Sequence, residues 1–348
     1  MMTFRGNRLR DLSIPMGTMW LLADIAEARG KQDLFTRQSP QILKVLRETA
    51  KVESVESSNR IEGVTVAPER LRPLVIGNAQ PRDRSEEEIR GYRRALELIH
   101  TKSTDLPMTP EALCHLHRTA QEGGGDAGVW KQRDNDIVEY REGQAPRVRL
   151  RPVSFKKASA AVEELCLAYE DHLAQSRTMP IVALACFVFD FLCIHPFRDG
   201  NGRVSRLITL LGLYQLGYEV GRYISLERLV EQSREDYYEV LRLSSVNWHE
   251  GKHDIMPWLN FLLTIIRRAY RDFEERAGQV KSPRGAKTGM VETAIDATIG
   301  QFQISEIEAM CPGVSRELIR RVLQRRRREG KLFCTGYGVR ARWKKKMR

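Results

Sequence analysis

Apolar residues return every three or four positions in several segments of the chain, which is the period of an α-helix that packs along one face. The alternating pattern of a β-strand is scarce before residue 300. It is clear only over residues 145–152, and a partner strand is expected near residues 136–140. The pattern predicts a mainly helical body with one small hairpin. The predicted helices cover residues 40–58, 86–101, 155–174, 181–194, 203–216 and 255–275.

Residues 276–289 interrupt this pattern, because they are poor in bulky apolar residues and rich in Gly, Lys and Pro. Such a composition is typical of a flexible connection. Beyond it we expect a helix over 290–299, a short helical stretch, a turn at 311–314, and a second helix over 315–329 with Ser315 as its N-cap. Two short strands joined by a Gly-rich turn follow. This order predicts a winged helix-turn-helix module, whose second helix can enter a DNA major groove.

The chain is long enough, at 348 residues, for more than one compact unit. We expect a helical N-terminal region over residues 1–47, a helical core over 48–275, a linker over 276–289 and the winged-helix module over 290–348. No apolar run reaches membrane-spanning length and no signal-peptide pattern is present, so we expect a cytoplasmic protein with no membrane partner. The six scattered cysteines suggest no disulfide framework.

The net charge of +12 is concentrated at one end of the chain. Residues 313–348 contain 14 basic and 2 acidic residues, and the rest of the chain is formally neutral. Charge runs such as residues 325–328 and 344–346 are often only solvated. Here they coincide with the predicted winged helix, so we expect contacts with DNA phosphates through residues 290–348, with docking of a protein partner as the alternative.

The most distinctive polar residues lie in the segment 194–206, IHPFRDGNGRVSR, between two predicted apolar helices. Gly200 and Gly202 permit backbone conformations in which successive N–H groups converge beside a helix N-terminus, and such a nest binds phosphate. Arg203 and Arg206 stand three positions apart, so both can reach a polyphosphate from one helix face. The segment therefore predicts a nucleotide-binding site.

Two further residues of this segment suit catalysis. His195 follows the first helix and can take a proton from a hydroxyl near neutral pH. Asp199 can hold a Mg²⁺ ion that bridges phosphate oxygens. An isolated DGNG sequence is usually an ordinary turn with solvated arginines. The presence of His, Asp, two Gly and two Arg in one register favours the functional interpretation.

Residues 195–206, HPFRDGNGRVSR, resemble the HPFx(D/E)GNGRxxR motif of the Fic family at every defining position. The resemblance implies a Fic-type helical core and a protein adenylyltransferase, which transfers AMP from ATP to a protein hydroxyl. It also implies that His195 is the general base, that Asp199 binds Mg²⁺ and that Phe197 anchors the loop. By the same resemblance the residues that hold the phosphates are Asn201, Gly202, Arg203 and Arg206.

A second motif lies upstream, where Ser58 and Glu62 stand four positions apart and Gly63 can end a helix. The spacing resembles the (S/T)xxxE(G/N) inhibitory motif of many Fic proteins, although alone it fits any capped surface helix. The resemblance implies an inhibitory helix over about residues 54–63 whose Glu62 pairs with Arg206. That carboxylate would compete with phosphate for the guanidinium and keep the γ-phosphate out of its productive pose.

Several other residues allow two interpretations. The hairpin over residues 136–149 resembles the flap that aligns target segments in the family, or is a plain surface hairpin. Tyr237 and Tyr238 either line the adenine pocket or pack inward from a helix. The remaining histidines show no metal-ligand spacing and are expected to be structural or exposed. Large apolar side chains are expected in the core, namely Met16, Trp20 and Trp258.

The sequence therefore predicts a Mg²⁺-dependent protein adenylyltransferase that uses ATP, modifies a protein of unknown identity and is restrained by Glu62. Removal of AMP, a different nucleotide donor and a homodimer through the core helices stay open. The alternative from another class is a DNA-binding regulator whose Fic core senses a nucleotide. The intact His195 and Asp199 argue against it, because a sensor needs no catalytic base.

Overall fold

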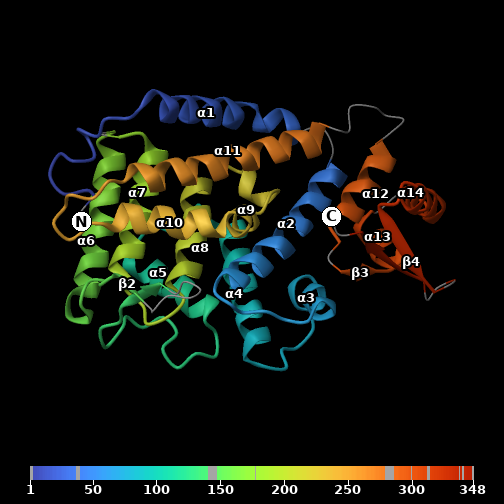
Figure 1. The fold of residues 1–348 in the computed structure, drawn as a ribbon, viewed down its shortest axis with the longest axis horizontal. Coiled ribbons are helices and arrows are strands. Elements are labelled where there is room, and N and C mark those ends of the chain that lie inside the picture. The colour runs from blue at the N-terminus through green and yellow to red at the C-terminus, as the bar shows by residue number, and fades with distance from the viewer. Residues whose placement is uncertain are drawn as a thin grey trace.

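The computed structural model describes residues 3–36, 40–139, 147–176, 178–278, 286–298, 300–311, 314–336, 338 and 341–346. This part of the chain is mainly helical, as predicted, with two small antiparallel sheets (Figure 1). The elements of the body are α1 (Met16–Thr36), α2 (Pro40–Ile61), α3 (Pro68–Val75), α4 (Arg84–Lys102), α5 (Pro110–Ala120), β1 (Ile137–Glu139), β2 (Arg147–Leu150), α6 (Phe155–Ala174), α7 (Pro180–Ile194), α8 (Asn201–Gln215), the 3₁₀ turn η1 (Val220–Arg222), α9 (Leu226–Gln232), α10 (Arg234–Ser245) and α11 (Met256–Gly278).

Helices α7 and α8 form the centre of the body, and α4, α5, α6 and α11 pack around them (Figure 1). Every residue of α7 from Ile181 to Ile194 is buried. Its sequence is apolar in all directions, which is typical of a helix surrounded by other helices. The six residues between α7 and α8 therefore join the two most buried helices, and their position is fixed from both ends.

Asp190 is the one charged residue in this apolar helix, and its carboxylate is fully buried. It accepts hydrogen bonds from the backbone N–H of Thr3 at 3.1 Å, from the Thr3 hydroxyl at 2.7 Å and from the indole of Trp248 at 2.7 Å. A buried carboxylate is tolerated only when it is hydrogen-bonded in this way. These bonds fasten the N-terminal segment to the centre of the body.

Helix α1 lies along α11, and the prediction that its Met16 and Trp20 are core residues is wrong (Figure 1). Met16 is 73% and Trp20 67% exposed, whereas Leu22 and Ile25 are buried. Apolar residues occur on both faces of this helix, so a pair four positions apart does not tell which face meets α11. Trp258, in contrast, is buried as predicted.

Several predicted boundaries shift. Helix α2 runs without interruption from Pro40 to Ile61, so the expected boundary after residue 47 falls inside it. Helix α8 begins at Asn201 rather than at residue 203, because Gly200, at φ +74°, supplies the N-cap. Helix α11 continues to Gly278 and the next helix begins at Ala286, which leaves residues 279–285 of the predicted linker outside the described part.

The C-terminal module packs beside the N-terminal half of α2, through its first helix (Figure 1). Ser315 caps the last helix, as predicted, by accepting a hydrogen bond from the N–H of Leu318. A short third strand, which the sequence pattern did not show, completes a sheet of order β3-β5-β4. The assignment to the winged-helix class stays a prediction. The elements are α12 (Ala286–Asp296), β3 (Gln301–Phe302), α13 (Ile304–Met310), α14 (Arg316–Arg328), β4 (Leu332–Thr335) and β5 (Arg342–Lys345).

Two global features follow from the described residues. None of their helices combines the length and the apolar character that crossing a bilayer requires. All six cysteines are free thiols, as expected, and four of them are buried.

The contact between α4 and α5 depends on a glycine. A Cβ atom on Gly91 would lie 2.6 Å from the backbone oxygen of Ala120. Because backbone cannot move aside cheaply, we expect Gly91→Ala to lower the free energy of unfolding by about 1–3 kcal/mol. Gly30→Ala, on the open side of α1, has no atom within 4 Å of the new methyl group and should raise it by up to ~1 kcal/mol. Urea denaturation of both variants measures the difference, and equal effects would contradict this packing.

Candidate active site

His195 ends α7 in the left-handed conformation, at φ +50° and ψ +58°. Its backbone N–H donates to the carbonyl of Phe191 at 2.9 Å. Its Nδ1 lies 3.3 Å from the carbonyl of Leu192. Because a carbonyl only accepts, this contact places the proton on Nδ1 and leaves Nε2 as an acceptor. The imidazole therefore has the tautomer that a general base needs.

Phe197 anchors the loop, as the resemblance implies. Its ring is fully buried and stacks on His117, with 3.8 Å between the ring centroids, and on Trp130 at 4.8 Å. His117 also holds the loop through polar contacts, because its Nδ1 accepts from the N–H of Gly128 at 2.8 Å and its Nε2 lies 3.0 Å from the carbonyl of Asp199. His117 was expected only to be structural or exposed, and nothing in its spacing indicated a place at the loop.

The side chain of Asn201 organises the loop. Its Oδ1 accepts from the N–H of Phe197 at 3.0 Å and its Nδ2 donates to the carbonyl of Phe197 at 2.9 Å. Both polar atoms are thus used within the loop, so a contact of Asn201 with phosphate falls to its backbone N–H. The first N–H groups of α8 have no partner inside the helix and carry the positive end of its dipole. They are free N–H donors at the position where the sequence predicts an anion site.

Arg206 is the polar centre of the site, and residues of α2 surround it. Its Nε donates to the hydroxyl of Ser58 at 2.8 Å, and its Nη2 donates to the carbonyl of Ser58 at 2.9 Å and to Oε1 of Glu62 at 2.7 Å. Ser58 is fully buried and Arg206 is 6% exposed. Burial opposes the charge of the guanidinium, but Glu62 raises the pKa of Arg206 above its usual value. The contact between Glu62 and Arg206 that the resemblance implies is therefore present.

The carboxylate of Glu62 also lies directly over the N-terminus of α8. A Cβ atom on Gly202 would fall 2.1 Å from Oε1 of Glu62. No side chain fits between the two. Within the described residues Nη1 of Arg206, which lies close to Gly202, has no hydrogen-bond partner. Glu62 thus lies against the first turn of α8, and one buried donor of Arg206 is left without a partner among the described residues.

The C-terminal end of α2 is held in this position by other contacts. Gly63, at φ +82°, ends the helix as predicted. The carbonyl of Ile61 accepts from Arg234 at 3.2 Å and from the hydroxyl of Tyr238 at 3.4 Å, both on α10. Farther back on α2, Ser54 donates to the buried carboxylate of Glu227 at 2.7 Å. The contacts of Glu62 thus depend on a helix that is anchored on two sides.

Arg203 and Asp199 differ in exposure. Arg203 is buried, forms an ion pair with Glu88 of α4 and lies 3.4 Å from Oδ1 of Asn59. The side chain of Asp199 is 76% exposed, its Oδ1 accepts from the N–H of Gly200 at 2.6 Å, and its Oδ2 lies 3.7 Å from Arg203. Within the described residues, no group of three or more His, Cys, Asp and Glu side chains could hold a metal alone. Mg²⁺ commonly binds through one carboxylate together with substrate phosphates and water, so an exposed Asp199 beside a phosphate nest fits it.

A cavity of about 740 Å³ opens above the loop, and the predicted catalytic residue His195 and the predicted inhibitory residue Glu62 line it, whereas Ser58 does not. The β1–β2 hairpin, which pairs antiparallel as predicted, forms one wall of the cavity. Residues 140–146 of the predicted flap lie outside the described part.

Both tyrosines of α10 line the cavity, and Tyr237 also packs against Trp258 and Phe261. Both interpretations of Tyr237 are therefore compatible with its position. The lining includes Glu62, Ile137, Val138, Arg149, His195, Gly202, Tyr237 and Tyr238.

The electrostatic surroundings keep His195 neutral. Burial lowers the pKa of its imidazole to about 4, and the positive charges of Lys131 and Arg149 act in the same direction. The carbonyl of Leu192 and the carboxylate of Glu62 oppose this shift. At neutral pH the ring is therefore unprotonated and ready to accept a proton.

Comparisons with known proteins agree with this geometry. Residues 107–213 match the Fic/DOC family. A protein from Nematostella vectensis named protein adenylyltransferase Fic is 24% identical over 258 residues, which are 71% of this chain and 54% of that protein. The chain spans about half the length of the curated relatives it matches. The chain is also similar to two crystal structures, each with a TM-score of 0.62. A Fic family protein from Desulfovibrio desulfuricans is 20% identical, and the match covers 97% of this chain and 98% of that one. A Fic domain containing signaling protein from Bacteroides thetaiotaomicron is 21% identical, and the match covers 74% of this chain and 98% of that one.

Neutral imidazoles inside the fold make it sensitive to acid. Burial lowers the pKa of His100 to about 3 and those of His195 and His253 to about 4. In the unfolded chain each takes up a proton below about pH 6.5, so the free energy of unfolding falls as the pH drops from about 6.5 to about 4. Burial raises the pKa of Asp190 to about 6, which opposes this loss, but one group does not offset three. Urea denaturation at pH 7, 6 and 5 should give successively lower midpoints. A midpoint that does not change would show that these rings are not buried as neutral groups.

Proposed function

Since residues 107–213 of this chain are a Fic domain, we propose that the protein transfers AMP from ATP to a hydroxyl side chain of another protein. The observation that carries the proposal is that neutral His195 and Gly202, in the first turn of α8, line one cavity, and that the buried guanidinium of Arg206 lies close to Gly202. The name of the Nematostella vectensis relative, a protein adenylyltransferase, supports it.

The residues suggest a direct displacement at the α-phosphorus. Nε2 of His195 accepts the proton of the incoming hydroxyl, whose oxygen forms a bond to the α-phosphorus. The bond from that phosphorus to the oxygen that bridges to the β-phosphate breaks, and pyrophosphate leaves with the electron pair. The N–H groups of α8 and the guanidinium of Arg206 stabilise the charge on the phosphates, because preorganised donors in a water-poor site act strongly on developing charge. Correct alignment supplies much of the remaining rate.

Mg²⁺ would be held by Asp199 together with phosphate oxygens of the substrate, and would neutralise part of their charge. Arg203 lies below this carboxylate and is tied to Glu88, so it supports the position of Asp199 from the interior. Its Nε is buried and has no hydrogen-bond partner within the described residues.

We further propose that Glu62 restrains the enzyme. Its carboxylate uses the guanidinium donor and the space over Gly202 that a phosphate needs. Two anions cannot share these positions without strong repulsion, so ATP binds with its terminal phosphate displaced or must expel Glu62.

Glu62→Gln and Glu62→Gly should raise the transfer of label from α-labelled ATP to protein roughly tenfold or more. A hydrogen bond to a charged group contributes about 1.5–3 kcal/mol, and each ~1.4 kcal/mol corresponds to a tenfold change. Adding His195→Ala should abolish the label. The assay follows self-modification in Mg²⁺ by gel autoradiography.

Glu56→Gln is the matched control for this experiment. Glu56 lies on the same helix and pairs with Arg60 instead of Arg206. Its loss should leave labelling unchanged. Equal stimulation by both variants would mean that loosening α2 matters rather than the carboxylate over Gly202. Labelling that persists without His195 would rule out the proposed base.

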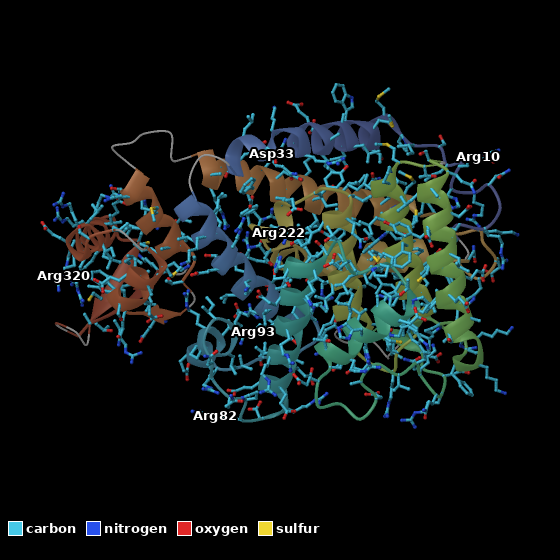
Figure 2. The ribbon with its side chains drawn as sticks, turned by 180° about the vertical axis from the view of Figure 1, so that it is seen from behind. Arg10, Asp33, Arg82, Arg93, Arg222 and Arg320 are labelled. Carbon is cyan, nitrogen blue, oxygen red and sulfur yellow. The ribbon has the colours of Figure 1, made fainter. Side chains whose placement is uncertain are left out.

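A second function is proposed for the C-terminal module, which would bind duplex DNA through α14. Arg325 and Arg326 of the basic run pair with Glu292 and Asp296 of α12, so half of that run is neutralised inside the module. In contrast, Arg320, Arg327 and Arg328 are exposed and form no ion pair within the described residues. Figure 2 shows Arg320 at the end of the molecule farthest from the body. A free basic helix face directed away from the body favours phosphate contacts over packing within the chain.

The triple variant Arg320→Ala, Arg327→Ala, Arg328→Ala should bind duplex DNA more weakly and with less salt dependence. Each lost phosphate contact lowers the slope of log affinity against log salt by about 0.9, so a decrease of about two to three is expected. Fluorescence anisotropy at several salt concentrations measures the slope. The control replaces three exposed basic residues of the body, Arg5, Lys102 and Lys252. Equal losses in both triple variants would place the contact elsewhere and favour a protein partner for the module.

A further inference from the structure

Lys131 lies beside the catalytic loop, and its side chain is only 4% exposed. Its Nζ donates to Oδ1 of Asn135 at 3.2 Å and to the carbonyl of Ile194 at 3.5 Å. Its backbone N–H donates to the carbonyl of Pro196 at 2.8 Å. One residue therefore contacts the backbone on both sides of His195.

The backbone at this point needs such support. A residue other than glycine in the left-handed region is strained, and it stays there only where its surroundings fix it. The last carbonyls of α7 also lack helical partners and carry the negative end of the helix dipole, which favours a nearby cation. Lys131 supplies that cation at Ile194. Asn135, which binds the ammonium group, extends the support by donating to the carbonyl of Arg198 at 3.4 Å.

The same ammonium group acts on the imidazole electrostatically. Burial lowers the pKa of Lys131 to about 8, an effect that Asp134 opposes, so the group stays charged at neutral pH. The charged groups that face His195 are Lys131 and Arg149, which disfavour a proton on the ring, and Glu62, which favours it. Of the two cations, only Lys131 also bonds to the backbone beside His195.

We propose that Lys131 is a positioning residue for the general base, which fixes the left-handed backbone at His195 and keeps the imidazole unprotonated. The expected effect on the labelling rate rests on the proposed transferase function, whereas the expected effect on the protonation of His195 does not. A buried lysine that only stabilises the fold would support the same hydrogen bonds without influencing protonation of His195.

The test compares Lys131→Met, Lys131→Gln and Lys131→Arg in a Glu62→Gln background, with Lys252→Met as control. Lys252 is an exposed lysine in the segment before α11. Methionine keeps the length of the stem and removes the charge, glutamine keeps a hydrogen-bond donor without charge, and arginine keeps the charge. Thermal unfolding first establishes which variants fold, and the gentler Lys131→Gln serves if Lys131→Met does not.

Two measurements follow on the folded variants. Titration of the His195 ring by NMR should show its pKa raised by about half to one pH unit without the charge, and restored by Lys131→Arg. In the pH profile of the labelling rate, the acid side should move to higher pH by the same amount. Lys252→Met should change neither the His195 titration nor this profile. An unshifted His195 titration would overturn the proposal, whether or not label is transferred. A shifted titration without label in any variant would support the role of Lys131 and reject the transferase function instead.

Discussion

The buried guanidinium of Arg206 is the constraint on which the arrangement of the site depends. A charge removed from water must be paired, and leaving it unpaired typically costs about 3–5 kcal/mol. Arg206 obtains its partners from another part of the chain, because Ser58 of α2 and Glu62, the residue after the end of α2, both bind it. The site is therefore formed by two segments that lie more than 140 positions apart in the chain. An anion of similar shape, such as a phosphate, is the natural competitor of Glu62.

The loop that faces this guanidinium is rigid because of the helices that it joins. Helices α7 and α8 are buried on all sides, so the loop between them cannot shift without disturbing the core. Phe197 inserts between His117 and Trp130, and Asn201 closes the loop on the backbone of Phe197. Residues that make no contact with substrate thus determine where His195 and Gly202 lie. Preorganisation of this kind is what electrostatic catalysis requires.

Ser58, which binds Arg206, and the contact with the C-terminal module lie on one helix. The N-terminal half of α2 packs against α12, while its C-terminal end carries Ser58 and Glu62 (Figure 1). Among the charged residues of the module, Lys345 faces Glu53 of α2. The basic face of α14 is directed away from this contact (Figure 2). Helix α2 therefore connects the cavity lined by His195 and Glu62 with the module that carries the basic face of α14.

The sequence by itself determined the mainly helical body and the position of most helices, and it predicted the residues of the candidate catalytic loop. Helical periodicity and short motifs depend on neighbours within a few positions, and such local patterns survive in a single sequence. The contact of Glu62 with Arg206 was foreseen only through the resemblance to a family. Only the tertiary structure decided that Met16 and Trp20 face outward, that α2 crosses the expected domain boundary and that the short strand β3 completes a sheet. It also brought His117 and Lys131 to the loop from distant positions. These facts depend on which faces meet in space, and a pattern of nearest neighbours along one chain carries no information about that.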